Sequence, residues 1–296
     1  MERGTETPYP LFDAHMHFSQ AYLEAGLASF ETYGIGGGIN LWGGAFLHGH
    51  GFSCDFREFL EIRRRRGLER FAAFYWPPWS EFGWRPEAFV RRLCDDMRRY
   101  AALGATGLKV WKDLGMFILH ADGTPATMDE TALECVWATA AELGWTIAVH
   151  QADPSRAFAR PTRAGLSREE LFERRNRVLS AHPEIRFILC HNGNDVESVA
   201  GWAALLEAQP HCLADMNRDP CRHDTVEDVR DFLERYADRI LWGTDLGMPQ
   251  DRPGDDAWCM EHIFNPWRSR LASWGLSDEA LHKITWGNGE RYFLPG

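Results

Sequence analysis

The sequence is short of basic residues, and this shortage limits what the protein can bind. Its 296 residues include 32 lysines and arginines against 43 aspartates and glutamates, which gives a net charge of −11. Nucleic acids and anionic membranes bind to basic protein faces, so neither is an expected partner. We therefore expect the protein to act on a small-molecule substrate.

Long apolar runs and paired cysteines are also missing. No apolar run approaches the roughly 20 residues that span a bilayer, and the first residues lack the apolar core of a signal peptide. The seven cysteines are irregularly spaced and form no Cys-x-x-Cys motif, which is typical of reduced thiols in the cytosol. These absences predict a cytoplasmic protein.

What the sequence does contain is a series of short apolar runs, each followed by polar or glycine-rich residues and a longer amphipathic stretch. Near-continuous apolar runs are typical of strands buried on both faces, as in a parallel sheet. We predict eight strands, at residues 11–15, 38–42, 70–76, 107–111, 146–150, 186–190, 211–216 and 240–244.

Helix signals fall between these strands. Pro86 stands where a first helical turn tolerates proline, and capping boxes begin at Thr127 and Ser167. The sequence predicts helices over residues 86–103, 127–143, 167–182 and 225–236.

Eight strands alternating with helices, without a linker, predict a single (β/α)8 barrel over residues 1–296. An open, doubly wound sheet is the alternative. Such a sheet is expected to carry a phosphate-binding glycine loop after an early strand. The glycine-rich residues 34–38 instead precede the second strand, and we predict that they form a turn. The barrel is therefore favoured.

Five side chains able to bind a metal stand at the ends of predicted strands. His15 and His17 are two residues apart on the first strand, so both imidazoles can point to the same face. His150, His191 and Asp245 follow the fifth, sixth and eighth strands. In a barrel these strand ends meet at one mouth. Imidazole and carboxylate ligands suit zinc, manganese or iron, and zinc is the expected ion.

The order His-x-His, His, His, Asp on successive strands resembles the amidohydrolase superfamily. The resemblance is closer to its amidohydrolase-related branch, which includes aminocarboxymuconate-semialdehyde decarboxylase and has an ending similar to GNGERYF at residues 287–293. Members of that branch are often dimers, so a homodimer is an expectation. The resemblance implies one divalent metal, with catalysis by Asp245 and His191 and with metal ligands His15, His17, His150 and Asp245.

Lysine is scarce, yet two of the three lysines, Lys109 and Lys112, lie in one short segment. In binuclear branches of the superfamily, a carboxylated lysine on the fourth strand bridges two metals. Lys109 lies on that predicted strand, where the decarboxylase branch does not usually have a lysine. Two metals therefore remain an alternative, as do substrate contact and a structural role for Lys109. We expect Lys112 to bind an anionic substrate.

Further substrate contacts are expected around the mouth. Trp42, Trp76 and Trp111 stand at strand ends, where indole rings would form an apolar or aromatic wall, with core packing as the alternative for each. Asn192 follows His191 directly and is expected to hydrogen-bond the substrate or to shape the turn. Arg218 follows the seventh strand and is expected to bind a carboxylate through two parallel hydrogen bonds, with a surface ion pair as the alternative.

These residues predict metal-dependent hydrolysis of a C–N or C–O bond in an amide, lactone or ester. The metal would lower the pKa of a water toward about 7, and Asp245 would act as general base and then general acid. The alternative is metal-dependent non-oxidative decarboxylation or hydration of an unsaturated or aromatic carboxylic acid. A metal-free barrel that only binds ligands is disfavoured, because all five ligand positions are filled.

Overall fold

The structure is a computed structural model, and it describes residues 10–17, 30, 33–41, 56–194, 197–217, 224–247 and 265–294. The strands form one sheet in the order β8-β7-β6-β5-β4-β3-β2-β1-β9, and every neighbouring pair is parallel. They are β1 (Leu11–His17), β2 (Ile35–Leu41), β3 (Phe71–Tyr75), β4 (Gly107–Val110), β5 (Thr146–Val149), β6 (Phe187–Leu189), β7 (Cys212–Met216), β8 (Ile240–Trp242) and β9 (Leu246–Gly247).

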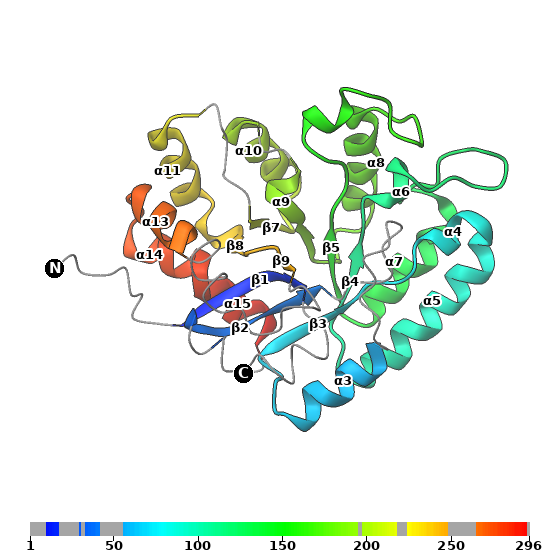
Figure 1. Cartoon of the computed structure of the whole chain (residues 1–296), viewed down its shortest axis with the longest axis horizontal. Helices are drawn as coiled ribbons and strands as arrows, with labels where there is room; N and C mark the ends of the chain where they lie inside the picture. Colours follow the sequence, from blue (N-terminus) through cyan, green and yellow to red (C-terminus); the bar gives the residue numbers. More distant parts are fainter. Residues whose placement is uncertain are drawn as a thin grey trace.

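The sheet closes into the predicted (β/α)8 barrel where β8 meets β1. The short β9 follows β8 and pairs with the end of β1. The buried Asp13 carboxylate adds a second link, since it accepts hydrogen bonds from the backbone N–H groups of His15 and Thr244 and from the Thr244 hydroxyl. Helices lie around the strands (Figure 1). The prediction of a barrel is therefore confirmed.

All eight predicted strands are present, and the main difference is at β2. Residues 34–38, predicted as a turn, mostly belong to this strand, which begins at Ile35. Glycine is needed here for close packing between strands. A Cβ at Gly38 would collide with the backbone carbonyl of Asp13 on β1, and one at Gly37 would lie 2.8 Å from the Arg70 carbonyl. The turn prediction was therefore wrong.

Three of the four predicted helices begin where expected. Ser167 and Thr225 each make both hydrogen bonds of a capping box at the start of a helix. Thr127 does not begin a helix, because its hydroxyl donates to Asp129 and the α-helix starts only at Glu134.

No described helix is long and apolar enough to cross a membrane. The α-helices are α3 (Phe56–Arg65), α4 (Ser80–Trp84), α5 (Pro86–Ala101), α6 (Asp113–Met116), α7 (Glu134–Glu142), α8 (Arg168–Ala181), α9 (Cys190–Gly193), α10 (Val199–Ala208), α11 (Val226–Arg235), α13 (Asn265–Ser273), α14 (Asp278–His282) and α15 (Asn288–Phe293).

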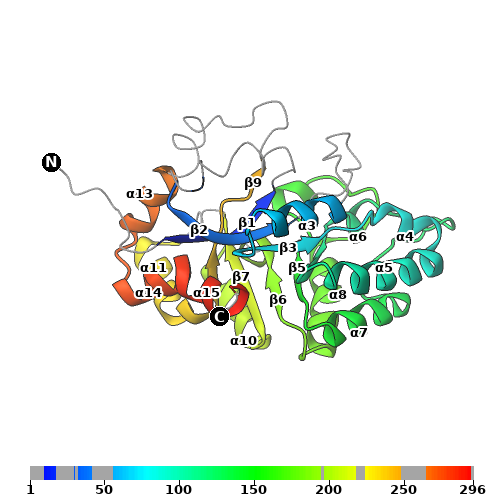
Figure 2. The ribbon, with the colours of Figure 1, turned by 90° about the horizontal axis from the view of Figure 1, so that it is seen from below.

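The C-terminal helix α15 covers one end of the barrel interior. Phe293 stacks on Phe12 of β1 with ring centroids 6.0 Å apart, and Gly289 packs so closely on Phe12 that a Cβ would not fit. Figure 2 shows α15 and β9 on opposite sides of β1. Apolar side chains therefore fill the end where strands begin, and the polar side chains gather where strands finish.

Candidate metal centre

Three predicted metal ligands lie together where β1 and β8 end. Asp245 Oδ1 is 3.4 Å from His15 Nε2 and 3.6 Å from His17 Nε2. One donor atom from each residue lies within 4.8 Å of the other two, so a single ion could contact all three. The His15 side chain is fully buried, whereas that of Asp245 is 23% exposed. The carboxylate is therefore the part of this group that a bound molecule can reach.

The backbone at Asp245 is held in an uncommon conformation. Its φ of +57° lies in the left-handed region, which residues other than glycine rarely adopt. Its N–H donates to the carbonyl of His15 at 2.8 Å, and the next residue, Leu246, begins β9 and pairs with β1. Strain of this kind persists only where surrounding contacts enforce it, and it is common at functional sites.

Both histidines of β1 are oriented by hydrogen bonds to Nδ1. His15 Nδ1–H donates to Asp215 Oδ2 at 2.7 Å, and His17 Nδ1–H donates to the carbonyl of Leu41 at 2.6 Å. A neutral imidazole that donates through Nδ1 keeps a lone pair on Nε2. His15 Nε2 is buried and has no hydrogen-bond partner among the described residues. The group therefore fits a divalent cation, with the hydrogen-bonding arrangement that metal-binding histidines usually have.

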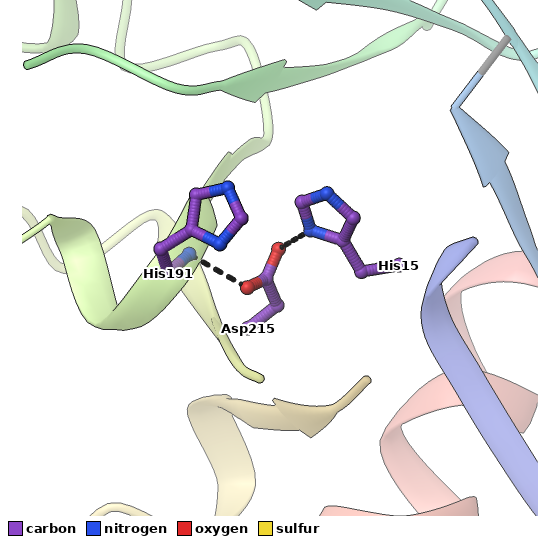
Figure 3. A group of neighbouring side chains, drawn as sticks. All are labelled: His15, His191 and Asp215. Carbon is purple, nitrogen blue, oxygen red and sulfur yellow. Dashed lines mark hydrogen bonds and ion pairs between the residues drawn. The ribbon is translucent and has the colours of Figure 1, made fainter. Parts of the chain in front are cut away.

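Asp215 is a central residue that sequence reasoning missed. Its carboxylate binds His15 through one oxygen, and the other accepts the backbone N–H of His191 at 2.7 Å (Figure 3). Burial would raise the pKa of Asp215, but the adjacent His15 keeps it below its usual value. Although its spacing with His15 and His191 would also suit an ion, these hydrogen bonds already satisfy the carboxylate. The sequence does contain one signal for Asp215: it is an acidic residue inside the apolar strand predicted at residues 211–216.

A chain of hydrogen bonds extends from Asp215 to His150. Asn217 donates its amide to Asp215 Oδ1 at 3.0 Å, so its own oxygen faces His191 Nδ1, 2.7 Å away, and accepts that N–H. His191 Nε2 then accepts from His150 Nδ1 at 3.0 Å. Burial lowers the pKa of His191 to about 4, which keeps the ring neutral at pH 7. Asn217 thus sets the tautomers of both histidines.

His150 lies next to the group of three but outside it. Its Nδ1 contacts His191, and its Nε2 is 3.3 Å from Asp153 Oδ1. Because Nδ1 donates to His191, the lone pair of His150 is on Nε2, so to serve as the predicted fourth ligand the ring must exchange its contact with Asp153 for the ion. His191 is nearer to Asp245, with its Nδ1 3.9 Å from Oδ2, which suits the catalytic role predicted for it.

The two lysines of the β4 segment occupy different environments. Lys109 is fully buried and its Nζ donates to the thiol of Cys190 at 3.0 Å, with no carboxylate in ion-pair distance among the described residues. Lys112 is partly exposed and forms an ion pair with Asp153, another residue that the sequence did not indicate. The predicted substrate contact by Lys112 is therefore compatible with its position near the histidines.

Two of the three tryptophans predicted to form an aromatic wall lie beside the histidines. The Trp76 ring lies 5.8 Å from that of His17 and 4.7 Å from that of Trp111, which in turn meets His150 edge-on at 4.6 Å. Asn192 is buried directly after His191, with the positive φ that His191 also has. The remaining two predicted substrate contacts, Trp42 and Arg218, lie outside the described residues.

Comparison with known proteins gives a family and a fold. The family model described as Amidohydrolase matches residues 82–294. No curated protein matches the chain. A 2,6-dihydroxybenzoate decarboxylase from Rhizobium has 18% identity and a TM-score of 0.56, with 96% of this chain and 98% of that chain covered.

Two further solved structures cover the same shares, 96% of this chain and 98% of theirs. One is described as a probable 2-pyrone-4,6-dicarboxylic acid hydrolase from Acinetobacter baumannii, with 10% identity and a TM-score of 0.60. The other is a 5-carboxyvanillate decarboxylase from Sphingomonas paucimobilis, with 12% identity and a TM-score of 0.56. At such identities the likeness supports a shared fold and leaves the reaction open.

Proposed function

Because the chain belongs to the amidohydrolase family, we propose that it is a metal-dependent enzyme that hydrolyses a C–N or C–O bond in an amide, lactone or ester. One observation carries this proposal. Asp245, His15 and His17 bring one donor atom each to a common point, and the Nε2 atom of His15 is buried without a hydrogen-bond partner among the described residues.

The ion would be held by His15 and His17 through Nε2, by Asp245, and by His150 once that ring exchanges one of its present contacts. Zinc suits two or three imidazoles and a carboxylate, and manganese or iron would also fit. A bound divalent ion supplies a water with a pKa near 7 and a positive charge that polarises a carbonyl. Asp215 keeps the His15 ring oriented for this role.

Asp245 is the proposed general base and then general acid. Burial would raise the pKa of Asp245, but the neighbouring histidines His191, His17 and His15 hold it well below its usual value. The carboxylate is therefore ionised at neutral pH and can accept a proton from the attacking water. It would return that proton to the leaving nitrogen or oxygen. Neutral His191 lies close enough to orient the substrate or the water.

Decarboxylation or hydration of an unsaturated or aromatic acid is the second candidate. The similarity to two decarboxylases of substituted benzoates favours it, as do the indole rings of Trp76 and Trp111 that pack beside the histidines. In this reaction Asp245 or His191 would deliver a proton to carbon. Both candidates use the same metal ligands, so the first test concerns the metal.

The first test is metal content by plasma mass spectrometry on protein purified without chelator, for the wild type and His15→Ala. We expect about one zinc, manganese or iron per chain in the wild type and a loss in the variant. About two ions would favour a bridging role for Lys109. Absence of metal even after reconstitution would overturn the proposal. Loaded protein is then assayed on aryl amides, lactones and esters for hydrolysis and on hydroxybenzoates for carbon dioxide release.

A further inference from the structure

Beside the candidate centre, a lysine and an aspartate form an ion pair that the proposed chemistry does not use. Lys112 Nζ contacts both carboxylate oxygens of Asp153, at 2.9 Å and 2.6 Å. The side chains are 22% and 21% exposed, so the pair is accessible from solvent. The same carboxylate lies 3.3 Å from Nε2 of His150, one of the predicted metal ligands.

The surroundings of this pair are those of a site for a planar acid. Lys112 Nζ lies 5.3 Å from the ring centroid of Trp111, which meets His150 edge-on. Trp76, which is buried, packs between Trp111 and His17. A flat substrate resting on the partly exposed Trp111 would lie between His150 and the Lys112 ammonium group. Aromatic surface with one well-placed cation is typical of sites that orient a small anionic ligand.

The position of Asp153 in a loop allows its carboxylate to move away from Lys112. It stands in the loop after β5, directly after Ala152, whose φ of +70° is uncommon for a residue other than glycine. Its shortest contacts are with Lys112, whereas the contact with His150 is longer. A carboxylate of the substrate can take the place of Asp153 because the exchange keeps the Lys112 ammonium paired with an anion.

We propose that Lys112 and Trp111 form a subsite for a carboxylate of the substrate, and that Asp153 occupies this subsite in the free protein. The proposal rests on the proposed function and narrows its substrate class to planar carboxylic acids, including acids that carry a lactone or ester. A neutral substrate would leave the Lys112–Asp153 pair in place. An acid instead replaces Asp153, so the exchange selects for anions.

The experiment is a calorimetric titration of zinc-loaded and metal-free protein with benzoate, and with benzamide as the neutral probe of the same shape. Lys112→Gln is expected to weaken benzoate binding about tenfold, because the cation is lost. Asp153→Asn is expected to tighten benzoate binding about tenfold, because the internal competitor loses its charge. Benzamide affinity should change in neither variant.

Lys283→Gln is the matched control. It makes the same change in the third lysine of the chain, which pairs with Asp238 and Glu279 away from the barrel mouth. Its benzoate affinity should equal that of the wild type. Circular dichroism establishes that each variant is folded. In the double variant Lys112→Gln/Asp153→Asn, benzoate should bind more weakly than in Asp153→Asn alone, because the Lys112 cation is missing.

Unchanged benzoate affinity in Lys112→Gln, or no gain in Asp153→Asn, would overturn the subsite. An equal gain for benzamide in Asp153→Asn would also overturn it, because charge would then play no part. These outcomes are separate from failure of the proposed function. A protein that binds metal and turns over substrate can still lack the subsite, and the metal-free titration tests the subsite even if no metal binds.

Discussion

The two sides of the barrel mouth are built differently. On the β1, β7 and β8 side, His15 and Asp215 are fully buried, and each is fixed by hydrogen bonds at or below 3.0 Å. On the β4 and β5 side, Lys112 and Asp153 are partly exposed; Lys112 lies between β4 and α6, and Asp153 lies in the loop after β5. The buried residues of the first side have few other hydrogen-bond partners within reach. On the second side, Lys112 can exchange Asp153 for another carboxylate.

This difference separates two tasks. An ion needs ligands held in one geometry by a second set of hydrogen-bonded residues. A substrate needs groups that are accessible before binding and that can change partners when it arrives. Changes on the buried side should therefore abolish chemistry or metal binding, and changes on the exposed side should alter affinity by smaller factors.

Asp245→Asn is the substitution expected to have the largest effect. The amide keeps the shape of the side chain but cannot accept a proton from water, so turnover should fall by about a thousandfold. The loss of turnover is measured by steady-state kinetics on whichever of the assayed amides, lactones, esters or hydroxybenzoates proves to be a substrate. Metal analysis and circular dichroism accompany the kinetics. A variant that is folded, retains its metal and keeps the wild-type rate would show that Asp245 is not the base.

A pH effect on stability follows from the buried histidines. Burial lowers the pKa of His191 from 6.5 to about 4, so between these values the unfolded chain binds a proton that the folded chain does not. The contribution of His191 to the free energy of unfolding is therefore fully present above pH 6.5 and is lost as the pH falls toward 4. Between pH 7 and pH 5 the loss should be about 2 kcal/mol.

Urea denaturation of metal-free wild type and His191→Gln at both pH values isolates this contribution. The buried Asp13 acts in the opposite direction, because burial raises its pKa to about 7 and the folded state then holds the extra proton. The difference between the two proteins, and not the wild-type slope alone, reports on His191. Parallel pH dependence in both would contradict the prediction.

Asp215→Asn should weaken the metal centre without removing a ligand. The new amide would place an N–H against His15 Nδ1 or against the backbone N–H of His191, both of which now donate to the carboxylate. The His15 ring would then change tautomer and lose its free Nε2. We expect metal affinity to fall about 10- to 100-fold in competition with a chelating dye. Asp231→Asn, on an exposed helix surface, is the control with unchanged affinity.

The contrast between the two sides also explains how far the sequence could predict the site. The strands and the group of His15, His17 and Asp245 were predictable, because apolar runs and a two-residue spacing are local signals. Asp215 was not, because its role depends on a hydrogen bond to a residue 200 positions earlier in the chain. Asp153 was not either, since its position depends on the positive φ of Ala152 in a loop.

The exposed side should show the smallest effects, and Trp111→Phe tests it. Phenylalanine keeps an apolar ring beside His150 but has a weaker attraction for the Lys112 ammonium and a smaller face for a planar acid. Benzoate affinity should fall about two- to fivefold, with metal content unchanged. Trp84→Phe is the control, because Trp84 is 79% exposed on α4. A loss of metal in Trp111→Phe would mean that the indole supports the ligands as well, and that the two sides of the mouth are not independent.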